Sequence, residues 1–129
     1  MAKILYVEDH YDIFELYGRW LTRARHEVRH ARDAAAALEA VRAEKPDLIL
    51  LDIRLGEFSV NGWEVNRALK ADPATRDIPV ICFSATAEDP DHRERAQVEG
   101  FVAHLDKVSV SRKALVDCVA DCLGGKAEP

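Results

Sequence analysis

Short apolar runs alternate with amphipathic segments along the whole chain. The apolar runs are KILYV, EVRHA, DLILL, PVICF and FVAHL. After each run, apolar residues recur at helical spacing, which predicts helices near residues 11–24, 33–43, 61–70, 90–98 and 109–123. This alternation predicts an α/β domain in which five strands form a parallel sheet with helices on both faces.

The apolar spacing also predicts which surfaces are buried. DLILL and PVICF are continuously apolar, as expected for central strands covered on both faces. The first helix should place one stripe against the sheet and leave Tyr11 and Phe14 outside it. The stripe consists of Ile13, Leu16, Tyr17, Trp20, Leu21 and Ala24. The fourth helix offers little beyond Ala96 and Val98 to the core, so we expect weak docking.

Composition narrows the range of functions. The chain has 129 residues, 48% of them hydrophobic and 32% charged, which predicts one domain over residues 1–124 and a loose tail over 125–129. A net charge of −5 argues against direct binding to nucleic acid, which requires clustered Lys and Arg. No apolar run approaches membrane-spanning length, so we expect a cytoplasmic protein with no membrane partner. The three cysteines are expected to be reduced.

Polar residues follow four of the predicted strands at the ends where open parallel sheets bind ligands. They are Glu8 and Asp9 after the first run, Asp52 after the third, Ser84 after the fourth, and Asp106 and Lys107 after the fifth. Clustered carboxylates repel, so without a cation at least one should shift toward its protonated form. An all-oxygen site favours Mg²⁺. Lys107 should pair with Asp52 and, with the Ser84 hydroxyl, hold phosphoryl oxygens.

Any one of these residues has an ordinary structural explanation, such as helix capping or a turn. The combination is more specific, and it resembles the receiver domains of two-component response regulators. The resemblance lies in ILYVED, LILLDI, CFSA, NGWEV and Lys107, and it covers nearly the whole chain. It implies a flavodoxin-like fold of five βα units with strand order 2-1-3-4-5, in a stand-alone receiver of the single-domain type.

The resemblance also implies roles for individual residues. Asp52 is the phosphoacceptor, Asp9 and Asp52 bind Mg²⁺ directly, Glu8 acts through water, and the carbonyl of Arg54 completes the ligands. Ser84 and Lys107 bind the phosphoryl group and report it to the face formed by the fourth helix, fifth strand and fifth helix. A sensor histidine kinase or a histidine phosphotransfer protein donates the phosphoryl group, and output passes to a downstream protein. Self-dephosphorylation, and not substrate turnover, completes the cycle.

The chain departs from the usual receiver pattern in three places. The loop after Asp52 reads IRLGEFSVNG, where receivers more often have Met-Pro and a shorter path to Gly62. Val108 follows Lys107 in place of the usual Pro, and we expect a trans bond there because a non-proline cis bond costs about 2.5–4 kcal/mol. His104 stands where many receivers carry a switching Tyr or Phe, and we expect protonation of its ring to oppose activation.

Two other functions compete with phosphorelay signalling. A haloacid-dehalogenase-type phosphatase also forms an aspartyl phosphate after a strand, but its signature needs a second acid two residues beyond the nucleophile, where this chain has Arg54. A degenerate receiver would act only as a binding module, and the intact set of acids, Ser84 and Lys107 argues against it.

Overall fold

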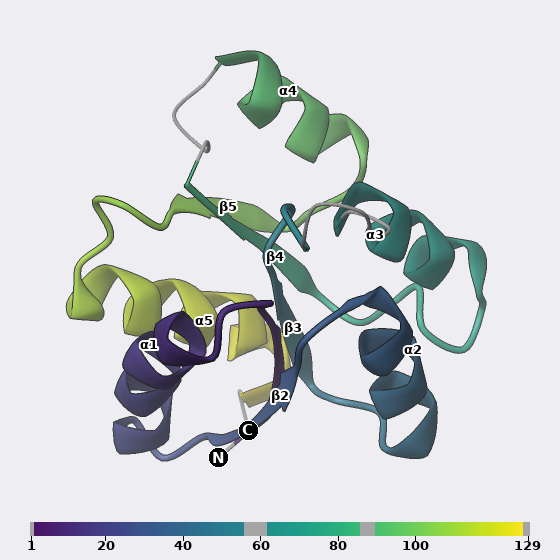
Figure 1. The fold of residues 1–129 in the computed structure, drawn as a ribbon. Coiled ribbons are helices and arrows are strands. Elements are labelled where there is room, and N and C mark those ends of the chain that lie inside the picture. The colour runs from purple at the N-terminus through teal and green to yellow at the C-terminus, as the bar shows by residue number, and fades with distance from the viewer. Residues whose placement is uncertain (1, 56–61, 86–89, 128–129) are drawn as a thin grey trace.

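The fold is a five-stranded parallel sheet with helices on both faces (Figure 1). It is seen in a computed structural model that describes residues 2–55, 62–85 and 90–127. The strands are β1 (Lys3–Val7), β2 (Glu27–Ala31), β3 (Leu48–Leu51), β4 (Val80–Ser84) and β5 (Ala103–Asp106). They lie in the order β2-β1-β3-β4-β5, and every neighbouring pair is parallel. The predicted fold class and strand order are confirmed.

Alternate residues of the central strands supply two separate cores. In β3, Leu48 and Leu50 face one core and Ile49 and Leu51 the other, because successive side chains of a strand point to opposite faces. Helices α1 (Tyr11–Arg23) and α5 (Arg112–Ala127) cover the first core, on the left in Figure 1. Helices α2 (Ala34–Ala43) and α3 (Gly62–Ala71) cover the second, on the right.

The last helix is shifted from its predicted bounds at both ends. Ser111 accepts a hydrogen bond from the amide of Ala114 (3.0 Å), so the helix begins after this cap and not at Ser109. At its other end α5 continues to Ala127, beyond the predicted end at Leu123 and into the expected tail. Gly124 costs about 1 kcal/mol of helix propensity relative to Ala, and the helix nevertheless continues through it. Residues 128 and 129 of that tail lie outside the described part of the chain.

The predicted buried stripe of α1 is wrong at two positions. Leu16 is 47% exposed, whereas Phe14 is half-buried and stacks on His30, with ring centroids 4.1 Å apart. At 3.6 residues per turn, Leu16 lies about 100° around the helix from Tyr17, and Phe14 only about 60°. Tyr11 remains exposed, as predicted.

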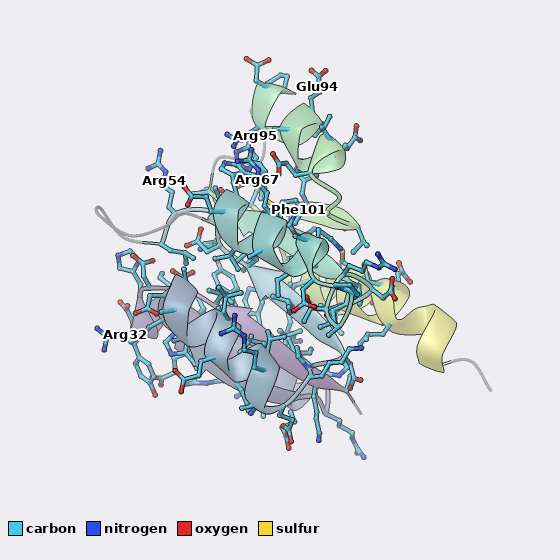
Figure 2. The ribbon with its side chains drawn as sticks, turned by 90° about the vertical axis from the view of Figure 1, so that its right-hand side faces the viewer. Arg32, Arg54, Arg67, Glu94, Arg95 and Phe101 are labelled. Carbon is cyan, nitrogen blue, oxygen red and sulfur yellow. The ribbon has the colours of Figure 1, made fainter. Side chains whose placement is uncertain are left out.

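Helix α4 (Pro90–Val98) docks mainly through polar and aromatic contacts. Ala96 is buried as predicted, but Val98 is 80% exposed. The guanidinium of Arg95 lies 4.2 Å from the ring centre of Trp63 on α3, and Glu99 pairs with Arg67 at 2.7 Å. Figure 2 shows Arg67 and Arg95 side by side where α4 meets α3. Apolar side chains therefore contribute little to the docking of α4 on α3. The contact of Arg95 with Trp63 could not be predicted from the sequence of α4 alone.

None of the helices in the described ranges combines the length and apolar character needed to cross a membrane. Cys82, Cys118 and Cys122 are free thiols, as expected.

Candidate functional site

A pocket opens at the carboxyl ends of β1, β3 and β4, and it contains the predicted site residues. Its lining consists of Glu8, Asp9, His10, Ile13, Asp52, Arg54, Ser84, Ala85 and Lys107. The chain leaves β1 for β2 on one side and reaches β3 on the other, so the loops after β1 and β3 diverge and leave a crevice between them. The topology therefore collects side chains that are far apart in the sequence.

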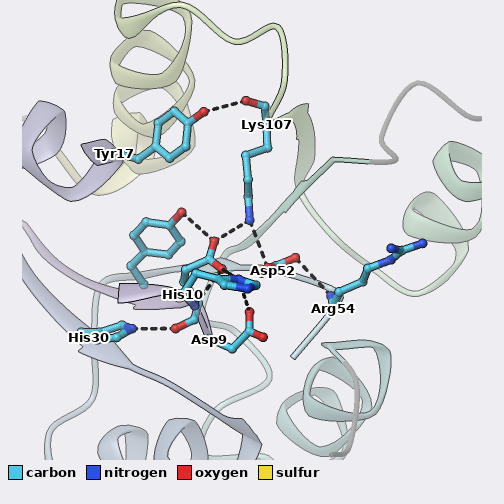
Figure 3. A network of polar contacts seen from close by, with 9 residues as sticks. Asp9, His10, Tyr17, His30, Asp52, Arg54 and Lys107 are labelled. Carbon is cyan, nitrogen blue, oxygen red and sulfur yellow. Dashed lines mark hydrogen bonds and ion pairs between the residues drawn. The ribbon is translucent and has the colours of Figure 1, made fainter. Parts of the chain in front are cut away.

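Lys107 joins the two buried acids of the pocket (Figure 3). Its ammonium lies 3.0 Å from Asp52 Oδ2 and donates a hydrogen bond to Glu8 Oε1. Glu8 is 1% exposed and Asp52 6%, so both carboxylates depend on this cation for compensation. The predicted pairing of Lys107 with Asp52 in the resting state is confirmed.

The two acids respond differently to this environment. Burial raises the pKa of the Asp52 carboxyl to about 6; Lys107 opposes the rise, and the neighbouring charge of Glu8 adds to it. Burial also acts to raise the pKa of Glu8, but the hydrogen bond and charge of Lys107 outweigh it and hold that pKa below its ordinary value. The sequence predicted that one carboxyl would shift toward its protonated form, and that carboxyl is Asp52.

Two residues that the sequence analysis missed hold Glu8 in place. The Tyr6 hydroxyl donates to Glu8 Oε1 (3.2 Å), and the His30 ring Nε2 lies 2.6 Å from the Glu8 backbone oxygen. Tyr6 is fully buried inside an apolar strand, where its hydroxyl needs a partner. A tyrosine two residues before an acid at the end of a strand is the only signal in the sequence for this contact.

The donor set of the pocket fits a divalent cation. Asp9 Oδ1 is buried and has no hydrogen-bond partner among the described residues. A buried carboxylate oxygen without a partner costs free energy that a bound cation removes. The carboxylates of Glu8, Asp9 and Asp52 all line this pocket, and oxygen ligands match the preference of Mg²⁺.

The loop that carries Lys107 is tied to α1. The Tyr17 hydroxyl donates to the backbone oxygen of Lys107 (2.7 Å), and the Lys107 amide donates to Ser84 O (3.0 Å). The Lys107–Val108 peptide bond is trans, as predicted. The Asp106 carboxylate accepts from the Val108 amide (3.0 Å) and fixes the turn that follows.

Replacing Tyr17 with Phe should loosen this loop and leave the aromatic packing intact. Loss of one hydrogen bond should lower the free energy of unfolding by about 1 kcal/mol. Denaturant titration measures this effect. The matched control is Tyr11→Phe, because Tyr11 is 64% exposed; equal behaviour of the two variants would contradict the role of the Tyr17 hydroxyl.

Gly62 packs directly against the backbone that carries Asp52. Its amide donates to Ile53 O (2.7 Å), and a Cβ atom there would lie 2.5 Å from Asp52 O. Gly62→Ala should therefore lower the free energy of unfolding by about 3 kcal/mol, at the upper end for overpacking. Gly124→Ala is the control, because a Cβ there meets nothing within 4 Å. Equal denaturation midpoints for the two variants would contradict this prediction, because they would show that the backbone at Asp52 moves aside for the added methyl group at little cost.

The remaining predicted residues occupy three different settings. Ser84 is buried at the end of β4 and lines the pocket. Arg54 lines it too, and its amide donates to Asp52 Oδ1 (3.1 Å). His104 is half-buried on β5, and its Nε2 accepts a hydrogen bond from Arg93 Nε of α4 (3.2 Å). Its switching role stays a prediction, as do the metal roles of Glu8, Asp9, Asp52 and the Arg54 carbonyl.

The loop after Asp52, which departs from the usual receiver pattern, falls mostly in residues 56–61, outside the described residues.

Comparisons with known proteins identify the family of the chain. The sequence profile of the response regulator receiver domain matches residues 4–120. The polar-differentiation response regulator DivK of Brucella anthropi is 35% identical over 122 residues, which cover 94% of this chain and 95% of DivK.

Solved structures of receivers superimpose closely. The signal receiver domain of a histidine kinase from Syntrophus aciditrophicus has a TM-score of 0.86 and 27% identity, covering 100% of this chain and 95% of that one. The chemotaxis regulator CheY4 of Vibrio cholerae has a TM-score of 0.84 at 24% identity, covering 95% and 99% respectively, and shows the shared fold. This chain belongs to the response regulator receiver family, whose members are signalling modules of two-component systems.

Proposed function

We propose that this receiver accepts a phosphoryl group on Asp52 in a reaction that depends on Mg²⁺. The observation that carries the proposal is the placement of the buried Asp52 carboxylate, 3.0 Å from the Lys107 ammonium in a pocket that also holds Glu8, Asp9 and Ser84. Glu8 also follows an interior strand and contacts Lys107, so the choice of Asp52 over Glu8 rests on the resemblance of LILLDI to the phosphoacceptor strand of receivers.

The residues divide the chemistry among them. An Asp52 oxygen attacks phosphorus, and the bond to the donor's leaving group breaks. The Lys107 ammonium, which pairs with Asp52 before the reaction, then pairs with an oxygen of the transferred phosphoryl group. The Ser84 hydroxyl donates a hydrogen bond to a second phosphoryl oxygen. Asp9 and Asp52, with Glu8 through water and the Arg54 carbonyl, would hold Mg²⁺, which neutralises charge between the carboxylates and the incoming phosphate. Attack by water on the acyl phosphate then restores the Asp52 carboxylate.

Membership of the family also supports a proposal about the partners of the protein and its location in the cell. The phosphoryl donor is a sensor histidine kinase or a histidine phosphotransfer protein, and a downstream protein reads the phosphorylated state in the cytoplasm. Contacts of α4, β5 and α5 would transmit that state, with Ser84 and His104 as switch residues.

Incubation with acetyl phosphate and Mg²⁺, followed by intact mass spectrometry, tests the proposal. We expect the mass of one phosphoryl group to be added with Mg²⁺ and none to be added when a chelator replaces it. No gain at saturating donor and Mg²⁺, or equal gain with the chelator, would overturn the proposal.

A further inference from the structure

The residue after Asp9 brings an imidazole to the acidic pocket. His10 Nδ1 lies 3.1 Å from Asp9 Oδ1 and 3.5 Å from Glu8 Oε2, and Figure 3 shows the His10 ring beside Asp9. The potential ligand atoms of Glu8, Asp9 and His10 all lie within 4.8 Å of one another. One nitrogen and two oxygens therefore converge on a small volume.

The short contact between His10 and Asp9 is not a hydrogen bond. Asp9 Oδ1 is buried, and within the described part of the chain it has no hydrogen-bond partner even though Nδ1 is 3.1 Å away. Two ligands at right angles, each bonded at about 2.1 Å to one ion, lie about 3 Å apart. A separation of 3.1 Å lies within hydrogen-bond range, so it is the direction of the contact that excludes a hydrogen bond. The same separation fits two atoms bound to one cation.

We propose that His10 supplies a nitrogen ligand to the cation site, so that the site binds a transition-metal ion more tightly than Mg²⁺. This proposal rests on the proposed function, which requires a bound cation, and it specifies which class of metal ion the site binds most tightly. Imidazole is a preferred ligand of Zn²⁺ and similar ions, whereas Mg²⁺ prefers oxygen ligands and retains its water. The His10 side chain is 68% exposed, so its ring can turn onto the ion without disturbing the core.

Co²⁺ is the probe, because it accepts nitrogen and oxygen ligands and shifts the NMR signals of a ligated imidazole far outside their normal range. Calorimetry on the full chain should give a dissociation constant at least about tenfold lower for Co²⁺ than for Mg²⁺. His10→Ala should weaken Co²⁺ binding about tenfold and Mg²⁺ binding less than twofold, and it should remove the shifted ring signal.

His26→Gln is the matched control. His26 precedes β2, at the edge of the sheet opposite the pocket, and its Nδ1 accepts from the Ala2 amide (3.3 Å). This variant should keep the parent's affinities and the shifted signal.

The outcomes separate this proposal from the proposed function. If Mg²⁺ supports phosphorylation but His10→Ala leaves Co²⁺ affinity and the ring signal unchanged, the nitrogen ligand is wrong and the phosphoacceptor site stands. If neither ion binds the parent chain and acetyl phosphate adds no mass, the proposed function itself fails.

Discussion

Replacing Asp52 with Asn should abolish phosphorylation and at the same time stabilise the metal-free protein. Asn lacks the nucleophilic carboxylate, so no phosphoryl group should be added from acetyl phosphate. Because burial raises the pKa of Asp52 to about 6, the ionised carboxylate is less favourable in the folded protein than in the unfolded chain. A shift of about two pKa units corresponds to about 3 kcal/mol, which is the order of stabilisation expected at neutral pH.

The pH dependence of this stabilisation has a definite sign. Below about pH 4, Asp52 is protonated in both states, and the variant should equal the parent. As pH rises toward 6, the unfolded chain loses this proton first and the parent becomes progressively less stable than the variant. Denaturant titrations from pH 4 to 8 measure the difference. A variant less stable than the parent at pH 7 would contradict the proposed burial cost.

Replacing Lys107 with Met should have the largest destabilising effect at the site. The side chain keeps its length and loses the ammonium, which leaves Glu8 and Asp52 buried without a cation. Breaking a buried ion pair by removing one partner costs about 3–5 kcal/mol, and phosphorylation should slow about 100-fold because a preorganised donor is lost.

Two further variants keep the Lys107 prediction testable. Lys113→Met removes an exposed lysine that pairs with Asp117 on the same helix, and it should leave stability unchanged. Combining Lys107→Met with Asp52→Asn should recover part of the lost stability, because one buried carboxylate is gone. A Lys107→Met protein as stable as the Lys113→Met control would show that the buried acids do not need the ammonium.

The sequence predicted the topology because β3 and β4 are apolar on both faces, a pattern typical of central parallel strands. It predicted the acids and Lys107 of the pocket because parallel strands end at one edge of a sheet. Both inferences depend on patterns within short stretches of sequence, namely the apolar strands and the polar residues that directly follow them.

The supports of the site were not predicted, because they depend on pairs that are distant in sequence. Tyr17 and Lys107 are brought together only when α1 packs beside the loop after β5. His30 reaches the Glu8 backbone only through the pairing of β1 with β2. The exposure of Val98 and the contact of Arg95 with Trp63 depend on how α4 settles on α3.

Chemical trapping of the phosphorylated residue tests the central claim most directly. Borohydride reduces an acyl phosphate to the alcohol and converts the modified Asp to homoserine. After incubation with acetyl phosphate and Mg²⁺, peptide mass spectrometry should find homoserine at position 52 and at no other acidic residue. Homoserine at position 9, or phosphate retained on a Ser or His with Asp52 intact, would contradict the assignment of Asp52 as the phosphoacceptor.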